Sequence, residues 1–270
     1  MKVSIVVVTY ERPELLSIAL DSILSQSHTE LEVIIVDDNS PSYLNNKKVI
    51  EDKKDSRLVY YRNTENKGAC YSRNYGLSLA TSKYVAFLDD DDLWDKDKIR
   101  QQVNSLNSTN AVLCYTAKRM FKNSDSSCGR VSFQEINEDL PLLSLFNNNV
   151  IGTTSCIMVN REVASSCGGF DIDLPAIQDY DFYLRIAAKG KVVSIKEPLT
   201  YYRVDTAIKI SKNGSKAITA SQMIIDKYPD NLKIKRYLFK ANLKKALKYR
   251  NLKLMIRTIS IFNYGENGFF

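Results

Sequence analysis

Hydrophobic and polar positions alternate in blocks over the first 90 residues, and these blocks predict a repeated strand–helix order. Continuous apolar, β-branched runs at residues 3–8 and 31–36 are typical of strands that are buried on both faces of a parallel sheet. Two further strands are predicted at 58–62 and 84–88. Between the first two runs, apolar residues recur at helical spacing and form one stripe: Leu15, Leu16, Ala19, Leu20, Ile23 and Leu24. The pattern predicts an α/β domain whose parallel sheet carries helices on both faces.

The pattern becomes less regular after residue 110. Residues 111–121 alternate as a strand does, and a polar turn at 124–129 can join them to a second strand of a hairpin. A loop of small residues at 151–155 precedes a predicted strand at 156–159. The remaining predicted elements are a short helix at 161–167, a helix that begins near residue 179, and two short strands at 191–195 and 199–204.

Polar tips follow three of the predicted strands, at Thr9–Arg12, Asp37–Ser40 and Asp89–Asp92. Because the carboxyl ends of parallel strands lie at one edge of a sheet, where ligands collect, we expect these tips to converge. Their like charges then need compensation by a bound cation or by a cationic side chain. The four consecutive aspartates supply hard oxygen ligands that suit Mg²⁺ or Mn²⁺. A solvated acidic turn is the alternative interpretation of this run.

Composition narrows the class of protein. The chain has 270 residues, of which 44% are apolar and 26% are charged, as in a folded globular protein. Its five cysteines include no CxxC pair, which favours reduced thiols and a cytoplasmic location. The single histidine, His28, excludes a histidine-cluster metal site and disfavours a Ser-His-Asp triad. The first residues are expected to form a strand and not a signal peptide, and no apolar run is long enough to span a bilayer.

Positive charge is concentrated towards the C-terminal end. The net charge is +7, and residues 221–270 hold eleven Lys or Arg but three Asp or Glu. In the stretch 217–262, apolar residues at helical spacing are interspersed with basic ones: Leu238, Leu243, Leu247, Leu254 and Ile261 with Lys240, Lys244, Lys245, Lys248, Arg250, Lys253 and Arg257. Basic amphipathic helices of this kind bind anionic membranes, so a peripheral position on the inner face of the cell membrane is one interpretation. The other is a helical appendage that packs its apolar side on the domain. Nucleic acid is disfavoured as a partner, because no aromatic stacking motif interleaves with the lysines.

Six segments carry a family likeness when they are taken in order: VSIVVVTYERPELLSIALDSILSQ, LEVIIVDDNSPS, NKGACYSRNYGL, YVAFLDDDDLW, GGFDIDL and QDYDFYLRIA. Over roughly residues 1–205 they resemble the family 2 glycosyltransferases, which are inverting, nucleotide-sugar-dependent enzymes of the GT-A fold. The resemblance implies a Rossmann-like, mostly parallel sheet flanked by helices. It also implies three parts: a nucleotide-sugar-binding half at 1–110, an acceptor-binding half of the same GT-A domain at 111–215, and a basic helical C-terminal extension at 216–270.

The resemblance also implies which residues bind the donor: Thr9, Tyr10, Glu11, Arg12, Asp38, Gly68, Arg73, Asp89 and Asp90. Within this set, Tyr10 would pack on the nucleotide base and Asp38 would accept a hydrogen bond from it. The run Asp89–Asp91 matches the DxD motif, whose first acid contacts the ribose. In that motif Asp91 would ligate the divalent ion, Mn²⁺ or Mg²⁺, that carries the diphosphate. Asp92 matches an extra acid that is often found beside the motif.

Asp179 matches the general base of the family, at a place where members usually have Glu-Asp and this chain has Gln178 and Asp179. The chemistry needs such groups, because a divalent ion stabilises the anionic leaving group and a carboxylate must take the proton of the acceptor hydroxyl. A base on the face opposite the leaving group gives a single displacement with inversion. Asp181 instead forms an i,i+4 pair with Arg185, which is an ordinary way to stabilise a helix.

One segment departs from the family pattern. Many members end the catalytic domain with a Tyr-x-Arg-x-His-like segment, whereas residues 201–205 read YYRVD, with Asp205 in the place of a histidine. Arg203, Lys209 and Lys212 are candidate replacement cations on a closing loop, although solvated surface charges are the favoured interpretation of the two lysines.

The favoured function is hexosyl transfer from a nucleotide-sugar, with a UDP-sugar preferred, to a hydroxyl of a glycan or lipid-linked oligosaccharide. Its setting would be the synthesis of a bacterial surface polysaccharide, an O-antigen or a capsule. A sugar nucleotidyltransferase is an alternative, but it would need a glycine-rich phosphate loop after the first strand, and TYERPE contains no glycine. A non-catalytic nucleotide- or metal-binding module is a third reading, and the presence of Asp91 and Asp179 argues against it.

Overall fold

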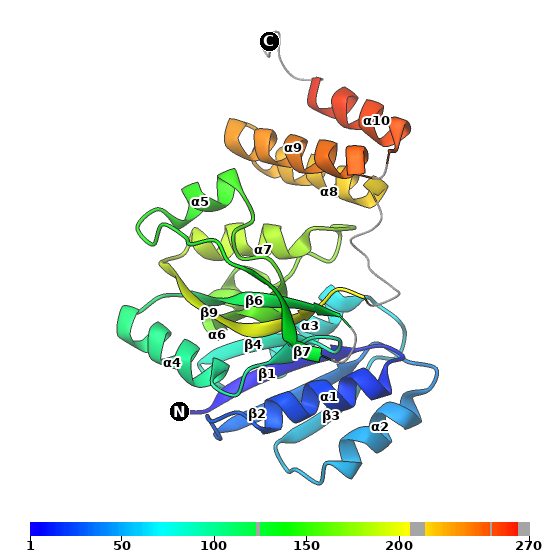
Figure 1. Ribbon diagram of the computed structural model, residues 1–270, viewed down its shortest axis with the longest axis vertical. Coiled ribbons are helices and arrows are strands. Elements are labelled where there is room, and N and C mark those ends of the chain that lie inside the picture. Colours follow the sequence, from blue (N-terminus) through cyan, green and yellow to red (C-terminus); the bar gives the residue numbers. More distant parts are fainter. Residues whose placement is uncertain (123–124, 206–213, 249, 264–270) are drawn as a thin grey trace.

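The computed structural model describes residues 1–122, 125–205, 214–248 and 250–263, which form a mixed sheet with helices on both faces (Figure 1). The strands are β1 (Val3–Thr9), β2 (Leu31–Asp37), β3 (Leu58–Arg62), β4 (Tyr84–Asp89), β5 (Leu93–Trp94), β6 (Leu113–Lys122), β7 (Asp125–Ser132), β8 (Ile157–Asn160) and β9 (Val192–Arg203). The helices are α1 (Pro13–Leu24), α2 (Tyr43–Asp52), α3 (Ala69–Leu79), α4 (Lys98–Thr109), α5 (Pro141–Asn147), the 3₁₀ turn η1 (Thr154–Cys156), α6 (Arg161–Ser166), α7 (Gln178–Ala187), α8 (Gly214–Lys227), α9 (Leu232–Lys248) and α10 (Leu252–Asn263).

The first four strands lie side by side in the order β3-β2-β1-β4, and all three of their pairings are parallel. Val8 of β1 is in register with Val36 of β2 and with Asp89 of β4. The carboxyl ends of these strands are therefore level, and the polar tips that follow them share one edge of the sheet. This is the α/β arrangement that the sequence predicted.

The other half of the sheet mixes the two strand directions. β8 runs antiparallel between β4 and β6, whereas β9 lies parallel to β6 and pairs antiparallel with the short β5. β7 pairs antiparallel with the far end of β6 as a hairpin. Parallel pairing thus dominates the first half, and the antiparallel strands widen the sheet towards the second half.

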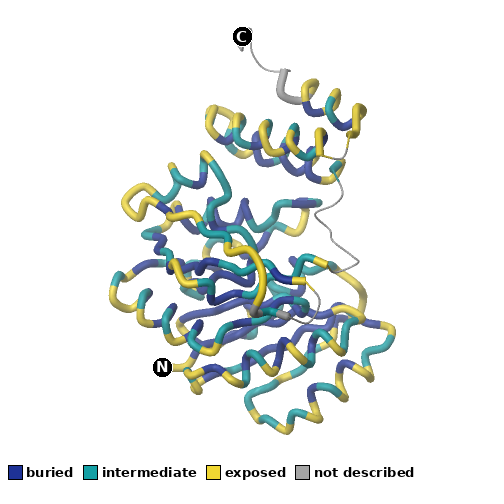
Figure 2. The backbone as a smooth tube through the Cα atoms, viewed as in Figure 1, coloured by how far each residue is buried: buried dark blue, intermediate teal, exposed yellow. Residues whose placement is uncertain are grey.

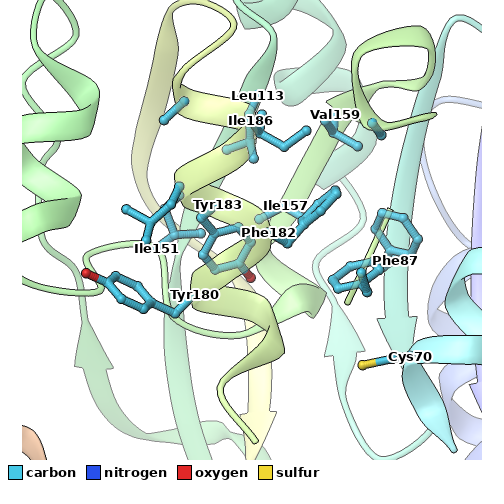
Figure 3. Close-up of a cluster of buried hydrophobic side chains, with 14 of the residues drawn as sticks. Cys70, Phe87, Leu113, Ile151, Ile157, Val159, Tyr180, Phe182, Tyr183 and Ile186 are labelled. Atoms are coloured by element: carbon cyan, nitrogen blue, oxygen red, sulfur yellow. The ribbon is translucent and has the colours of Figure 1, made fainter. Parts of the chain in front are cut away.

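Two hydrophobic cores lie on the two faces of the sheet, because alternate residues of a strand point in opposite directions. Val3, Ile5 and Val7 belong to the core covered by α1 and α4, and Val6 and Val8 to the core covered by α3, α6 and α7. Burial on both faces explains why β1 is apolar throughout, and the central strands are the most buried part of the backbone (Figure 2). The second core continues through Tyr180, Phe182 and Tyr183 of α7 (Figure 3). The ring of Phe182 stacks on that of Phe170, with the two centroids 4.2 Å apart.

Two predicted boundaries were wrong. The short strands expected at 191–195 and 199–204 are one strand, β9, whose pairing with β6 shifts register between Thr116 and Lys118. Most of the polar turn expected at 124–129 is instead part of β7, which begins at Asp125, and residues 123 and 124 lie outside the described residues. Gly129 is part of β7, where its φ of 140° and the closeness of the Met120 carbonyl leave no room for a Cβ.

The C-terminal helices pack on the rest of the chain at one end of the molecule (Figure 1). Ile224 of α8 and Leu238 of α9 belong to the core that includes α7. The ring of Tyr237 lies 5.1 Å from that of Tyr180, and Lys227 forms an ion pair with the buried Asp181. Among the described residues, no helix combines the length and the apolar character that a membrane crossing needs.

Candidate active site

The tips of β1 and β4 are joined by hydrogen bonds and ion pairs at the edge of the sheet. Thr9 Oγ1 donates a hydrogen bond to Asp90 Oδ2 at 2.8 Å. Arg12 Nη1 lies 3.0 Å from Asp90 Oδ1 and 3.2 Å from Asp91 Oδ2. The predicted convergence of polar tips is therefore present, and a cationic side chain offsets part of their charge. Asp90 is buried, and burial raises its pKa to about 7 despite the attraction of Arg12.

Asp89 is held from two sides. Arg73 of α3 forms an ion pair with Asp89 Oδ1, and the same guanidinium lies 5.6 Å above the ring of Phe170. On the other side, the backbone N–H of Asp89 donates to Ser155 Oγ at 3.2 Å. The small-residue loop before β8 thus contacts the acidic edge through Ser155. The sequence predicted the loop from its run of small residues, but it did not predict this contact.

Asp92 points inward. It is fully buried, and its Oδ1 accepts a hydrogen bond from the backbone N–H of Arg203 at 3.0 Å. Its Oδ2 is buried with no hydrogen-bond partner among the described residues. Burial and the neighbouring Asp91 raise the pKa of this carboxyl well above its usual range. An acceptor oxygen in this position is poised for a proton or a cation.

The oxygens of Asp91 and Asp92 are of the chemical type that binds a divalent cation. The described residues contain no preformed cluster of three or more His, Cys, Asp or Glu side chains that could hold a metal. Mg²⁺, however, commonly binds through one or two carboxylates and completes its shell with substrate phosphates and water. The partly exposed Asp91 and the unpartnered oxygen of Asp92 supply carboxylate ligands of this kind.

The tip of β2 organises the loop that begins α3. Asp38 is buried, and its two oxygens accept hydrogen bonds from Asn63 Nδ2 at 2.8 Å, from the backbone N–H groups of Lys67 and Gly68 at 2.9 and 2.8 Å, and from Ser72 Oγ at 3.1 Å. Gly68 adopts φ 85°, a conformation that favours glycine. Asp38 thus fixes the start of the helix that carries Arg73. Its predicted hydrogen bond to a base remains a prediction.

The tip of β1 presents an aromatic ring to solvent. The ring-bearing Tyr10 is 42% exposed, although the residues around it are held in place. Glu11, at φ 58°, accepts hydrogen bonds from the backbone N–H and the hydroxyl of Ser42, both at 2.7 Å. Thr9 and Glu11 therefore fix the loop, and Tyr10 is the member of the set that can stack on a ligand.

Asp179 lies in the first turn of α7, two residues after Ile177, which is in the left-handed conformation. Its Oδ1 accepts the backbone N–H of Tyr180 at 2.8 Å. Burial raises the pKa of this carboxyl, the positive charges of Arg73 and Lys118 lower it, and Asp89 raises it again. The ring of Phe182 on α7 stacks on that of Phe170, and Arg73, which pairs with Asp89, lies 5.6 Å from the ring of Phe170, so α7 packs beside the acidic edge. A carboxylate whose pKa lies above the usual range is a stronger base at neutral pH.

Other predicted residues take structural positions or lie beyond the described residues. Asp181 is fully buried and bonded to both Arg185 and Lys227, in agreement with its predicted structural role. Arg203 Nε donates to the backbone carbonyl of Asp91 at 3.2 Å, so this cation reaches the acidic edge. Lys209 and Lys212 lie outside the described residues.

Sequence comparison places these features in a known group of proteins. The family model described as glycosyl transferase family 2 matches residues 4–168. An Escherichia coli relative, the UDP-Glc:alpha-D-GlcNAc-diphosphoundecaprenol beta-1,3-glucosyltransferase WfaP, is 28% identical over 98% of this chain and 93% of its own. The putative teichuronic acid biosynthesis glycosyltransferase TuaG of Bacillus subtilis is 30% identical over 78% of this chain and 82% of its own. A Rickettsia felis glycosyltransferase is 30% identical, but the match spans 66% of this chain and one third (33%) of that longer relative.

Solved structures share the fold. Staphylococcus aureus TarS 1–349 in complex with UDP-GlcNAc aligns with a TM-score of 0.70 and 16% identity, over 97% of this chain and 80% of that one. The mannosyltransferase PcManGT of Pyrobaculum calidifontis, in complex with GDP-Man and Mn²⁺, aligns with a TM-score of 0.61 and 19% identity, over 96% of this chain and 73% of that one. The expected GT-A architecture is thereby confirmed.

Proposed function

Because the chain belongs to glycosyl transferase family 2, we propose that this enzyme transfers a sugar, with inversion, from a UDP-sugar to a hydroxyl group of a glycan acceptor. The observation that carries the proposal is the chain of contacts from Asp89 through Arg73 and Phe170 to Phe182, which packs α7, the helix of Asp179, beside the acidic edge at the end of β4. A displacement at a sugar carbon needs stabilisation of the departing diphosphate and removal of a proton from the attacking hydroxyl. The product would be a bacterial surface polysaccharide, an O-antigen or a capsule. The names of the relatives WfaP and TuaG, which refer to a diphosphoundecaprenol-linked acceptor and to teichuronic acid biosynthesis, support this type of product.

The donor would lie across the tips of β1 and β4. Tyr10, exposed at the end of β1, would stack on the uracil ring, and the loop fixed by Asp38 and Gly68 would border the nucleoside. Asp89, already oriented by Arg73, would contact the ribose. The UDP-GlcNAc complex of TarS, which has the same fold, supports a uridine nucleotide.

A divalent ion, Mn²⁺ or Mg²⁺, would be held by Asp91 with the second oxygen of Asp92 beside it, and it would stabilise the charge that develops on the leaving diphosphate. The chain's own contribution is to keep these acids in place without the ion. Arg12 does so by pairing with Asp90 and Asp91, which limits the repulsion along the run.

Asp179 would take the proton of the acceptor hydroxyl. Its position in the first turn of α7 suits a negative charge, because the N-terminal end of a helix carries partial positive charge. Arg73 and Lys118 favour the ionised form against the effect of burial. A single base acting on the acceptor, with no second nucleophile, corresponds to inversion at the anomeric carbon.

The test is an Asp179→Asn variant measured against a panel of nucleotide-sugars with Mn²⁺, with release of nucleoside diphosphate as the readout. The wild type should hydrolyse one donor slowly even without an acceptor. The variant should lose transfer by a factor on the order of 10² to 10⁴, the usual contribution of a general base, while UDP with Mn²⁺ still raises its melting temperature. Asp173→Asn, an exposed acid just before α7, is the matched control and should retain activity.

Two outcomes would contradict the proposal. Near-normal turnover of Asp179→Asn would remove this residue from the role of base. No release from any donor by the wild type, with or without EDTA, would favour a binding module over an enzyme of this specificity. Release of pyrophosphate from a nucleoside triphosphate and a sugar phosphate would point to nucleotidyl transfer instead.

We also infer a peripheral, cytoplasmic position at an anionic membrane surface, reached through the basic C-terminal helices. The acceptor in the name of WfaP is linked to a diphosphate lipid, and a lipid-linked acceptor is presented at a membrane. Lys and Arg residues near an anionic surface each contribute about 1 kcal/mol to binding.

A further inference from the structure

One buried residue, Ser155, contacts the acidic run at both of its ends. Ser155 is fully buried in η1, and its Oγ accepts a hydrogen bond from the backbone N–H of Asp89 at 3.2 Å. Its carbonyl accepts a hydrogen bond at 2.8 Å from Nε1 of Trp94, which follows Asp92 by two residues. The turn itself is closed by a hydrogen bond from the backbone N–H of Asp92 to the carbonyl of Asp89 at 3.0 Å. Ser155 thus spans the turn, with one hydrogen bond at its first acid and one just after its last.

A fully buried lysine lies behind this contact. Nζ of Lys98, on α4, is 4.1 Å from the centroid of the Trp94 ring and donates to Gln102 Oε1 at 2.6 Å. Gln102 in turn donates through Nε2 to the carbonyl of Cys156, the residue after Ser155, at 3.0 Å. These contacts close a ring that runs through Trp94, Lys98, Gln102, Cys156 and Ser155. Apolar packing alone does not call for a buried lysine, whose burial beside neutral partners costs free energy, and the ring fixes Trp94 and Ser155 relative to each other.

The strand β9 fixes the same turn from its other side. The backbone N–H of Arg203 donates to Asp92 Oδ1 at 3.0 Å, and Thr200 Oγ1 donates to the carbonyl of Ser155 at 3.4 Å. The orientation of Asp92 and the position of Ser155 are therefore tied to one strand. Mg²⁺ demands nearly ideal octahedral geometry, so carboxylates that are already in place bind it better than carboxylates that must first be ordered.

We propose that Ser155 and Trp94 are positioning residues for the divalent ion, because they hold the turn 89–92 closed so that Asp91 and Asp92 present their oxygens to it. The inference rests on the proposed function, in which these two acids hold the ion with the diphosphate of the donor. Neither Ser155 nor Trp94 would touch the ion or the donor. Adjacent carboxylates repel one another, and the two hydrogen bonds oppose the opening of the turn. The contribution of both residues therefore belongs to the part of donor binding that depends on the ion.

The test is the affinity for UDP, or for GDP where UDP does not bind, measured by calorimetry with Mn²⁺ and again with EDTA. The ratio of the two dissociation constants is the gain that the ion supplies. Ser155→Ala removes the acceptor of the Asp89 N–H, and Trp94→Phe keeps an aromatic face and removes the donor to the Ser155 carbonyl. Each variant should lower the gain by about three- to tenfold, the usual effect of one hydrogen bond, and should change the affinity in EDTA by less than about twofold. The double variant should lose little more than either single variant, because both residues act on the same turn.

Tyr84→Phe is the matched control. It removes the hydrogen bond at 3.0 Å from the hydroxyl of the buried Tyr84 to Asn107 Oδ1, at the opposite end of β4. Urea unfolding follows the stability of every variant, and the control should lose stability while it keeps the full gain from the ion. If Ser155→Ala does not fold, Trp94→Phe carries the comparison with the control.

The outcomes separate this inference from the proposed function. A full gain in both Ser155→Ala and Trp94→Phe, or an equal loss of affinity with Mn²⁺ and with EDTA, would give these residues a structural role only and overturn the inference, while the proposed reaction stands. The expected fall of the gain in a protein that transfers no sugar from any donor would support the inference and contradict the reaction. A wild type that shows no gain from Mn²⁺ or from Mg²⁺ would overturn both the proposed ion and this role.

Discussion

At the scale of single residues, four adjacent aspartates have four different surroundings. Asp89 pairs with Arg73 on α3, Asp90 is buried against Thr9, Asp91 is partly exposed beside Arg12, and Asp92 is buried beneath the end of β9. Because each carboxylate is fixed by a different element, the four aspartates can have different roles. The proposed ribose contact, the anchoring of the β1 loop and the proposed cation binding therefore need not compete for the same oxygen atoms.

The raised pKa of Asp179 predicts a pH dependence. A base must be ionised to act, so kcat/KM should fall at acid pH, and the midpoint should lie above 3.8, the ordinary value for an aspartate. The sign follows from the cause: burial disfavours the charged form, so the carboxyl keeps its proton to a higher pH than in water. The measurement is a profile of kcat/KM for the acceptor at saturating donor.

The matched variants make this profile interpretable. Asp173→Asn should keep the acid limb, and the residual activity of Asp179→Asn should lack it. Burial raises the pKa of the Asp90 carboxyl to about 7, so the titration of Asp90 is separated from that of Asp179 by following KM for the donor. A midpoint at or below 3.8 would contradict the buried environment assigned to Asp179.

At the scale of elements, the sequence predicted the features that depend on one segment alone and missed the features that depend on the pairing of two strands. β1, β2 and β4 were predictable because a strand buried on both faces must be apolar throughout. β9 was divided in two because Lys196, Glu197 and Pro198 interrupt its apolar pattern. The strand nevertheless continues, because its neighbour β6 shifts register at the same place. A bulge of this kind is set by two strands together and leaves no sign in either alone.

The packing of α3 on β1 gives a prediction for Gly76. A Cβ at this position would lie 2.4 Å from Cγ1 of Val6, which is fully buried in the sheet. Alanine would otherwise favour the helix by about 0.5–1 kcal/mol, but overpacking a core costs typically 1–3 kcal/mol, so Gly76→Ala should destabilise the fold. The midpoint of urea unfolding should fall relative to the wild type.

Ser78→Ala, on the exposed side of the same helix, is the control and should leave the midpoint nearly unchanged. If Gly76→Ala proved as stable as the wild type, the close contact between this helix and β1 would have to relax without cost.

The junction of α8 with α7 gives a second prediction at this scale. Lys227 reaches from α8 to the fully buried Asp181 at 2.8 Å and to Asp171 at 2.6 Å. In Lys227→Met, Asp181 keeps Arg185 as a partner, and the lysine that is removed is itself about one third exposed. The free energy of unfolding should therefore fall by about 1–2 kcal/mol, which is less than the roughly 3–5 kcal/mol expected when a buried ion pair is broken completely.

Chemical unfolding measures that loss, and Lys233→Met, an exposed lysine of α9, is its control. Since α7 also carries Asp179, the rate of transfer should fall with Lys227→Met more than with the control. Unchanged stability and rate would mean that α8 does not support the helix of the proposed base.

At the scale of the whole molecule, the structure separates two interpretations that the sequence left open for the C-terminal stretch. In the sequence, the surroundings of Leu238 and Leu254 do not differ in spacing or composition from those of the exposed apolar residues nearby. The hydrophobic pattern therefore could not predict which leucines face the domain. In the structure both are buried, and α8 and α9 pack on the second core. The appendage interpretation therefore describes α8 and α9, and the division of the chain at residue 216 remains a prediction.

α10 is different, because one of its faces is apolar and is not covered by any of the described residues. Leu252, Ile256 and Ile259 are 64%, 58% and 40% exposed and lie on one side of the helix, opposite the buried Leu254. Lys253 and Arg257 flank this face and are exposed as well. The outer side of the C-terminal helices is largely exposed (Figure 2). An apolar face bordered by cations matches the interface of an anionic bilayer, with acyl chains beneath acidic headgroups.

This face predicts which variants lose membrane binding. Replacement of Leu252, Ile256 and Ile259 by serine should weaken co-sedimentation with phosphatidylglycerol-containing vesicles by at least about tenfold, because each buried CH₂ group contributes about 0.8 kcal/mol. Lys253→Gln with Arg257→Gln should weaken it too, and should remove most of its sensitivity to salt.

The matched control replaces Ile18 and Leu44 by serine, because these side chains are 45% and 64% exposed on α1 and α2, at the opposite end of the molecule (Figure 1). Nonspecific attachment through any exposed apolar residue would affect both sets equally, whereas a specific interface weakens with the α10 set alone. Vesicles of phosphatidylcholine separate the two forces, since they retain the apolar contribution and lack the charge. Transfer to a water-soluble acceptor should proceed at the same rate in the wild type and in both α10 variants, because α10 contributes no residue to the proposed site. Equal sedimentation of these three proteins with the vesicles would contradict the assignment of α10 as the membrane-binding face.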